Sequence, residues 1–189
     1  DSVASFEQKR GTIVVVMKVN GRSLTSSVGS GNVFSTYNGP GIVWQFNATP
    51  MKYSFYDGVG AEELVAPGAV PLNWAIVTLV RSTDSTMDFY YDGRYQHSIP
   101  VKNLPSNATT IKIGYNGGSH FGGDYVAEVL NGEVAEIILY TRSLDAQELS
   151  TVHHYLSDKY NLPLQAAPYY EQLWFYGLLV LLVVLLVLL

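Results

Sequence analysis

The chain has no cysteine, no cluster of basic residues and few charges of either sign, and each absence excludes a class of site. Without cysteine there are no disulfides, thiolate metal sites or cysteine nucleophiles. Its 11 Lys and Arg residues are scattered and outnumbered by 16 Asp and Glu residues, which gives a formal net charge of −5. Because phosphate contacts need grouped basic side chains, we expect no nucleic-acid partner.

What is present favours strands and turns. Gly, Ser, Thr, Asn, Val and Tyr are abundant before the C-terminal segment, a composition that argues against disorder. This part, 1–164, is long enough for one domain with its own core. The first residue is Asp1, which fits a secreted chain whose signal has been removed, although a shortened chain would begin in the same way.

The C-terminal segment 173–189 reads LWFYGLLVLLVVLLVLL and carries no charge. As a helix rising ~1.5 Å per residue it would be about 25 Å long, near the short limit for a hydrocarbon core of ~30 Å. We therefore expect a transmembrane helix over 173–189, preceded by a short linker and aromatic interface over 165–172, with membrane lipid as a partner. Aromatic residues suited to the membrane interface flank its start: Tyr169, Tyr170, Trp174, Phe175 and Tyr176.

The orientation of this segment rests on the domain that precedes it. No Lys or Arg follows the segment, so the positive-inside rule gives no information about its orientation from that end. The signal removal suggested by Asp1, together with the fold type, favours a single-pass protein whose domain lies outside the cytoplasm. Its domain would lie in the periplasm or outside the cell, and its C-terminus at the cytoplasmic side of the membrane.

Strand patterns recur at short spacing through the domain, separated by Gly, Asn and Pro. They do not alternate with helices, so a parallel sheet is not expected and two packed antiparallel sheets are the natural solution. Asp92-Gly93 predicts a hairpin turn, because both positions tolerate positive φ. The predicted strands cover 12–19, 32–37, 42–46, 53–56, 74–81, 86–91, 94–98, 110–115 and 132–140.

One helix is predicted near the end of the domain. Asp145 can cap it, and Glu148 stands three residues on, as in a capping box. Pro163 prevents its continuation. We expect this short helix at the edge of the sandwich, with one apolar face formed by Leu149, Val152 and Leu156.

Two segments resemble laminin-G-like domains. The stretch NWAIVTLVRSTDSTMDFYYDGRYQ (73–96) is similar to that family's tryptophan strand and Tyr-x-Asp-Gly hairpin, and NGEVAEIILYTRSLDAQELSTVHHYLSDKYNL (131–162) is similar to its closing segment. The resemblance implies an all-β concanavalin-A-like jelly roll, the fold of many lectins and glucanases. Within it we expect Trp74 to pack between the sheets and Glu136 to orient the closing strand or pair with an Arg.

Glycosidase chemistry is not expected. Glucanases with this jelly roll carry carboxylates as Glu-x-Asp-x-Glu, so that period-2 spacing puts them on one face of a strand. Here the nearest set is Glu128, Glu133 and Glu136, spaced by five and three residues. Odd spacing places neighbouring members on opposite faces of a regular strand. We therefore predict no enzyme activity.

The four histidines do not predict a metal site. His153 and His154 are adjacent on the predicted helix and point about 100° apart, which suits no shared metal. His97 and His120 are isolated in strand or loop. We interpret all four as surface or edge residues.

Two ligand sites at the rim of the sandwich remain open as weak alternatives. Many laminin-G-like domains hold calcium there, and Asp57, Asp84 or Asp124 could supply oxygens. No other cofactor is expected. Lectins bind sugar with an Asp or Asn beside an aromatic platform, and here the candidates are Tyr115, Asn116, Asp124 and Tyr125.

Two functions follow as competing hypotheses. The first is a non-enzymatic, membrane-anchored interaction domain, an accessory or scaffolding subunit that binds other membrane proteins. The second is a lectin-like surface module that binds polysaccharide in the rim loops, with or without calcium. A divergent glycoside hydrolase is a third, which the carboxylate spacing disfavours.

Overall fold

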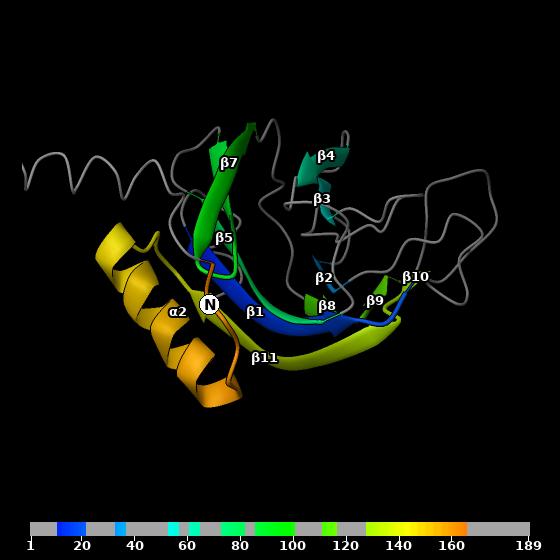
Figure 1. Ribbon diagram of the computed structural model, residues 1–189. Helices are drawn as coiled ribbons and strands as arrows, with labels where there is room; N and C mark the ends of the chain where they lie inside the picture. The colour runs from blue at the N-terminus through cyan, green and yellow to red at the C-terminus, as the bar shows by residue number, and fades with distance from the viewer. Residues whose placement is uncertain are drawn as a thin grey trace, which may run out of the picture.

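Five antiparallel strands form the central sheet, in the order β11-β1-β5-β6-β7 (Figure 1). The computed structural model describes residues 11–21, 33–36, 53–56, 61–64, 73–81, 86–100, 111–116 and 128–165. Within them the chain is mostly β. The sheet consists of β1 (Gly11–Val19), β5 (Trp74–Arg81), β6 (Thr86–Tyr91), β7 (Arg94–Pro100) and β11 (Gly132–Tyr140).

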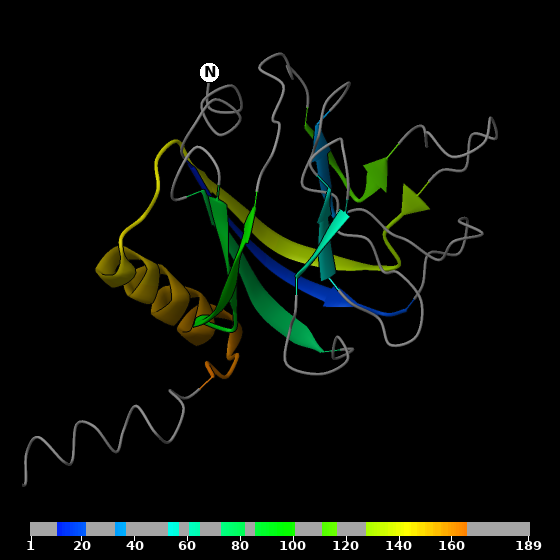
Figure 2. The same cartoon turned by 90° about the horizontal axis from the view of Figure 1, so that it is seen from above.

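The remaining described strands form three two-stranded pairs. β2 (Phe34–Thr36) pairs with β8 (Ile111–Ile113), β3 (Tyr53–Tyr56) with β4 (Ala61–Leu64), and β9 (Tyr115–Asn116) with β10 (Glu128–Val129). The described helix is α2 (Ala146–Tyr160). Figures 1 and 2 show α2 on one side of the central sheet and the three pairs on the other.

Most predicted strands are confirmed within a few residues of their ends. The segment predicted at 110–115 is divided at Gly114, whose φ of 72° breaks the strand into β8 and β9. β4 and β10 were not predicted, because neither carries a long apolar or alternating pattern. The strand predicted at 42–46 lies outside the described residues.

Strands β1 and β5 are buried on both faces, which explains their nearly continuous apolar sequences. Odd-numbered residues of both strands, such as Val15 and Val77, belong to a core cluster with Phe89 of β6. Even-numbered residues, such as Val16 and Ile76, face α2. An antiparallel strand with one solvent-exposed face would alternate apolar and polar residues instead.

Helix α2 begins at the predicted cap. The Asp145 carboxylate accepts hydrogen bonds from the Gln147 and Glu148 backbone N–H groups, both at 2.9 Å. The Glu148 carboxylate accepts from the Asp145 N–H at 3.0 Å and completes the capping box. Arg142 also binds Glu148, which lowers the pKa of that carboxyl to about 2. The helix ends at Asn161, whose φ of 52° reverses the chain before Pro163.

The helix lies on the face of the sheet and not at its edge, which corrects the sequence-based expectation. Leu156 is fully buried against Val14, Val16 and Ile76, which belong to the central strands β1 and β5. Trp74 packs in this same cluster, so it faces the helix side of the sheet and not the space between two sheets. Covering the face removes more apolar surface from water than covering an edge would.

The hairpin turn between β6 and β7 is confirmed and is fixed to its surroundings. Asp92 and Gly93 have φ of 47° and 80°. The Asp92 carboxylate accepts a hydrogen bond from the Ile76 N–H at 2.8 Å, and the Asp92 carbonyl accepts one from the Gln165 N–H at 2.8 Å. Burial raises the pKa of Asp92 to about 6, although the Ile76 hydrogen bond opposes this rise.

His153 is buried, contrary to the prediction of a surface residue. Its side chain is 2% exposed, and its Nε2 lies 2.9 Å from the Thr78 hydroxyl of β5. Burial, with a smaller effect of His154, lowers the pKa of His153 to about 4, so the ring is neutral near pH 7. His154 is exposed and His97 lies on the edge strand β7, both as predicted, whereas His120 lies outside the described residues.

In the part of the chain that the structure describes, no helix is long and apolar enough to cross a membrane. The predicted transmembrane segment 173–189 lies outside that part, as does the predicted linker 165–172 beyond Gln165.

Replacing Leu156 with Ala should lower the free energy of unfolding by about 2–5 kcal/mol, because it leaves a cavity between α2 and the sheet. Tyr155→Ala is the matched control, since Tyr155 is the preceding residue but is 52% exposed. We expect the control to change stability by about 0.5 kcal/mol or less. Denaturant unfolding measures both, and equal effects would show that α2 is not packed on the sheet as described.

Asp92 and His153 should give opposite pH dependences between about pH 4 and 6. The lowered pKa of His153 stabilises the fold above pH 6.5, and this stability is lost as pH falls towards 4. The raised pKa of Asp92 makes its buried carboxylate destabilising above about pH 6, and acid relieves this cost. The two effects should largely cancel in the native chain.

Asp92→Asn keeps the acceptor for Ile76 and tolerates positive φ, so it should expose the His153 effect alone. We expect the unfolding free energy of this variant to fall more steeply on acidification than that of the native chain, by about 1 kcal/mol per pH unit. His153→Gln should shift the slope in the other direction. Parallel pH profiles for all three proteins would contradict this assignment.

Candidate functional site

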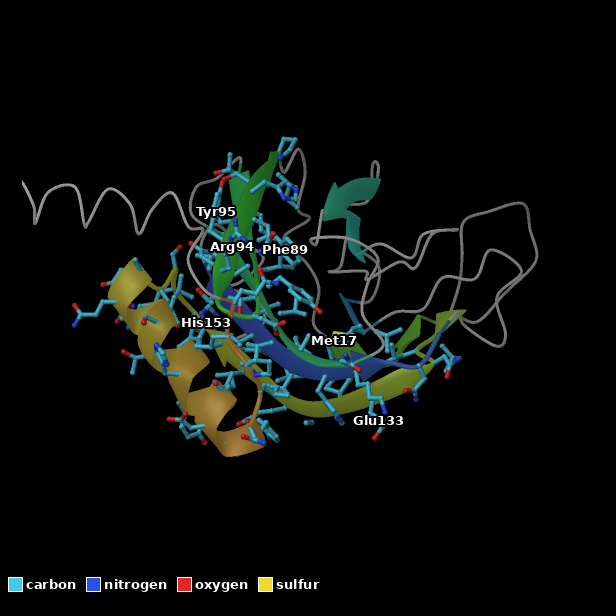
Figure 3. The ribbon with its side chains drawn as sticks, viewed as in Figure 1. Met17, Phe89, Arg94, Tyr95, Glu133 and His153 are labelled. Atoms are coloured by element: carbon cyan, nitrogen blue, oxygen red, sulfur yellow. The ribbon has the colours of Figure 1, made fainter. Side chains whose placement is uncertain are left out.

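A groove of about 530 Å³ runs between the β6–β7 hairpin and the first half of α2. The hairpin supplies Tyr90, Gly93 and Tyr95, and the segment after the helix supplies Leu164 and Gln165. Figure 3 shows Tyr95 on the hairpin and His153 on the helix that faces it. The helix contributes one wall of the groove: Ala146, Leu149, Ser150, His153 and His154.

The depth of the groove depends on how closely the helix approaches the hairpin turn. A Cβ added to Gly93 would lie 3.1 Å from Leu164 Cδ2 and 3.6 Å from His153 Cβ. Gly93 also has positive φ, so glycine suits this position for both backbone and packing reasons. The buried His153–Thr78 contact holds the helix against β5 at this level.

Two tyrosines form the aromatic side of the groove. The rings of Tyr90 and Tyr95 meet edge to face, with centroids 5.5 Å apart. Tyr90 also contacts the His153 ring, at a centroid distance of 6.1 Å, so it is held on two sides. Burial and the nearby Asp88 carboxylate raise the pKa of Tyr90, which keeps its hydroxyl protonated. Tyr95 is 49% exposed.

Tyr95 is itself positioned by a polar network on the hairpin. Its hydroxyl lies 3.0 Å from the Ser98 hydroxyl, and Ser98 donates a hydrogen bond to the Asp88 carboxylate on β6. The ring is thus held by the contact of its hydroxyl with Ser98 and by its edge-to-face contact with Tyr90. A preorganised exposed ring loses less conformational entropy when a ligand packs on it.

Three further polar side chains at the groove come from α2 and from the segment after it. Ser150 and His154 come from α2, and Gln165 comes from the segment that follows it. Among the described residues that line the groove there is no Lys, Arg, Asp or Glu. Such a surface can donate and accept hydrogen bonds, but it offers no lysine or arginine to pair with a carboxylate or phosphate.

The candidate catalytic carboxylates occupy the helix side of the sheet and are already paired. A β-bulge between Val16 and Met17 places Glu136 opposite Val16 and Glu133 opposite Lys18. The bulge brings Glu133 and Glu136 to one face despite their odd spacing, so our argument from a regular strand was incomplete. Glu133 pairs with Lys18 at 3.6 Å.

Glu136 pairs with a lysine of α2 and not with the expected arginine. Its carboxylate accepts hydrogen bonds from Lys159 Nζ and from the Tyr160 hydroxyl, both at 3.0 Å. The Lys159 hydrogen bond is the main cause that lowers the pKa of Glu136. A general acid of a glycosidase needs a raised pKa, so Glu136 is not suited to that role. For Glu128 only the strand backbone is described.

The sequence-predicted ligand residues lie largely outside the described part of the chain. Tyr115 and Asn116 form β9, where their backbones pair with Val129 and Glu128. For both residues only the backbone is described, and these sites stay predictions. Outside the described residues lie the calcium candidates Asp57, Asp84 and Asp124, the sugar candidate Tyr125, and the interface aromatics Tyr169, Tyr170, Trp174, Phe175 and Tyr176.

No group of three or more His, Asp or Glu side chains in the described ranges is arranged to hold a metal ion. The predicted calcium site falls in other ranges and therefore stays a prediction.

The groove was missed at the sequence level, although one signal pointed to it. His153 stands one turn from Leu149 and three residues before Leu156, so it lies on the apolar face of α2. A histidine in that position predicts burial and a hydrogen-bonding partner. The pairing with Tyr90 and Thr78 depends on tertiary packing, which the sequence pattern does not specify.

No protein-family model matches the chain, and no curated protein matches it. Solved structures do resemble it. One is a botulinum neurotoxin type C structure, from work showing that cell entry depends on two ganglioside molecules. It shares 14% identity over 79% of this chain and 36% of the other, with a TM-score of 0.56.

Two further solved structures also resemble the chain. A Trypanosoma rangeli sialidase mutant displaying trans-sialidase activity is 20% identical over 79% of this chain and 23% of its own, with a TM-score of 0.56. The binding domain of botulinum neurotoxin DC in complex with SialylT is 12% identical over 80% and 37%, with a TM-score of 0.55. The chain thus spans well under half the length of the structures it matches. At these identities the similarity shows the fold alone, which is that of an all-β sandwich.

Proposed function

We propose that the chain is a non-catalytic recognition domain that binds carbohydrate, and that the hairpin–helix groove takes a neutral sugar. The observation that carries this proposal is the groove itself. It combines an exposed tyrosine, which contacts Tyr90 and Ser98, with hydrogen-bonding groups from Ser150, His154 and Gln165. Sugar rings present an apolar face and a rim of hydroxyls, and such a surface is complementary to both.

The fold of the similar proteins supports this class of function. Among them are a neurotoxin that interacts with gangliosides and a neurotoxin binding domain in complex with SialylT. We infer that the three two-stranded pairs belong to the second sheet of a lectin-like jelly roll, because they lie across the central sheet from α2. Since a fold does not determine a ligand, the sugar class is argued from the groove and not from these proteins.

Three of the described carboxyl groups fit a non-catalytic role. Glu133 and Glu136 are each bound to a lysine, and both lie on the helix side of the sheet. The carboxyl with a raised pKa, Asp92, is engaged by the Ile76 N–H inside a tight turn. None of the three is one of the residues that line the groove.

A glycan array probed with the full chain in detergent tests the proposal. We expect binding to neutral glycans, and Tyr95→Ala should weaken it about tenfold or more, which corresponds to ~1.4 kcal/mol. Tyr155→Ala is the matched control, because Tyr155 is similarly exposed but lies outside the groove. We expect it to bind like the native chain. A blank array would contradict carbohydrate binding.

The same array separates the groove from the rim site predicted from the sequence. If Tyr95→Ala binds normally while Asp124→Ala or Tyr125→Ala does not, the ligand binds at the rim. Loss of that binding in a calcium chelator would then place calcium in the rim site.

A second candidate function is that of a membrane-anchored interaction domain, an accessory or scaffolding subunit of a membrane complex. The uncharged run 173–189 favours it. After gentle detergent extraction, we expect the full chain to migrate with other membrane proteins, and deletion of 173–189 to abolish this. Migration as a monomer in both forms would contradict it.

A further inference from the structure

The groove includes residues that stand shortly before the apolar C-terminal run in the sequence. Gln165 is one of these residues. Its backbone N–H donates to the Asp92 carbonyl at 2.8 Å, which fixes the departing chain to the hairpin turn. The packing of Leu164 against Gly93 holds the same segment one residue earlier.

The distance from this point to the apolar run is short. From residue 165 to residue 173 the chain advances by eight residues. At ~3.3–3.6 Å per residue these span at most about 26–29 Å, even when fully extended. If the run 173–189 lies in a bilayer, the groove is therefore held within about that distance of the start of the hydrocarbon core.

We propose that the groove binds the uncharged sugar headgroup of a lipid in the same bilayer that holds the chain. The inference rests on the proposed function and adds the source of the sugar. A ligand confined to the membrane surface beside a tethered site has a high effective concentration, so a groove with few polar groups is sufficient.

The charge of the groove selects among membrane lipids. No Lys, Arg, Asp or Glu occurs among the described residues that line it, and Arg94, although next to Tyr95 in sequence, is not one of them. A phosphate or carboxylate headgroup would lose its hydration without gaining a lysine or arginine partner. The net charge of the chain, −5, also disfavours anionic bilayers. A neutral hexose headgroup fits the Tyr95 ring and the groups on Ser150, His154 and Gln165.

The test uses the full chain reconstituted in phosphatidylcholine nanodiscs, with or without lactosylceramide. Hydrogen exchange of segments 86–100 and 146–165 reports occupancy of the groove. We expect lactosylceramide to slow exchange in both segments in the native chain and in Tyr155→Ala, and to have no effect in Tyr95→Ala. Free lactose should require a concentration more than about tenfold higher for the same protection. A sialylated glycolipid in place of lactosylceramide should give no protection.

The possible failures are distinguishable. Equal protection by lactosylceramide and by lactose at matched concentration would overturn the membrane source and leave sugar binding intact. Protection by the sialylated lipid, or protection that survives in Tyr95→Ala, would overturn the assignment to this groove. If lactosylceramide has no effect while the glycan array is positive, the inference fails and the proposed function stands. If the glycan array also shows no binding, both the inference and the proposed function fail.

Discussion

The structure depends on burial of both faces of the two central strands, β1 and β5. Their odd-numbered side chains pack with β6, and their even-numbered side chains pack with α2. Leaving either face in water would expose a continuous apolar surface, because neither strand alternates with polar residues. The helix is therefore a structural layer of the domain, and its position against β5 creates the groove beside the hairpin.

Two titratable groups with opposite effects on stability lie in α2 and in the hairpin turn. His153 is neutral in the folded chain because it is buried against Thr78. Asp92 is harder to ionise than usual because it is half-buried in the hairpin turn. Acidification lowers the stability of the fold through His153 and raises it through Asp92. A mildly acidic compartment would therefore change the stability of the domain less than either group alone would imply. His153 lines the groove, so the shape of the groove depends on the packing of α2.

The two tyrosines of the groove are positioned by the hairpin that carries them. Tyr90 faces α2, and Tyr95 lies opposite it on the next strand. Their pairing across β6 and β7 follows from the turn at Asp92 and Gly93, which fixes the register. The Tyr95 side chain is held by its ring contact with Tyr90 and by the hydrogen bond of its hydroxyl with Ser98. It would therefore lose little conformational entropy if a flat ligand packed on it.

The sequence by itself determined the strands with long apolar runs, the Asp-Gly turn, and the capped helix with its apolar face, because local sterics and periodicity decide these features. It also indicated a lectin-like sandwich from two segments, and the similar solved structures support an all-β sandwich. Only the tertiary structure decided that α2 covers the sheet face, that a bulge aligns Glu133 with Glu136, and that His153 is buried beside Tyr90. Those outcomes depend on register and on contacts between residues 60 or more positions apart, and no local pattern in the chain specifies them.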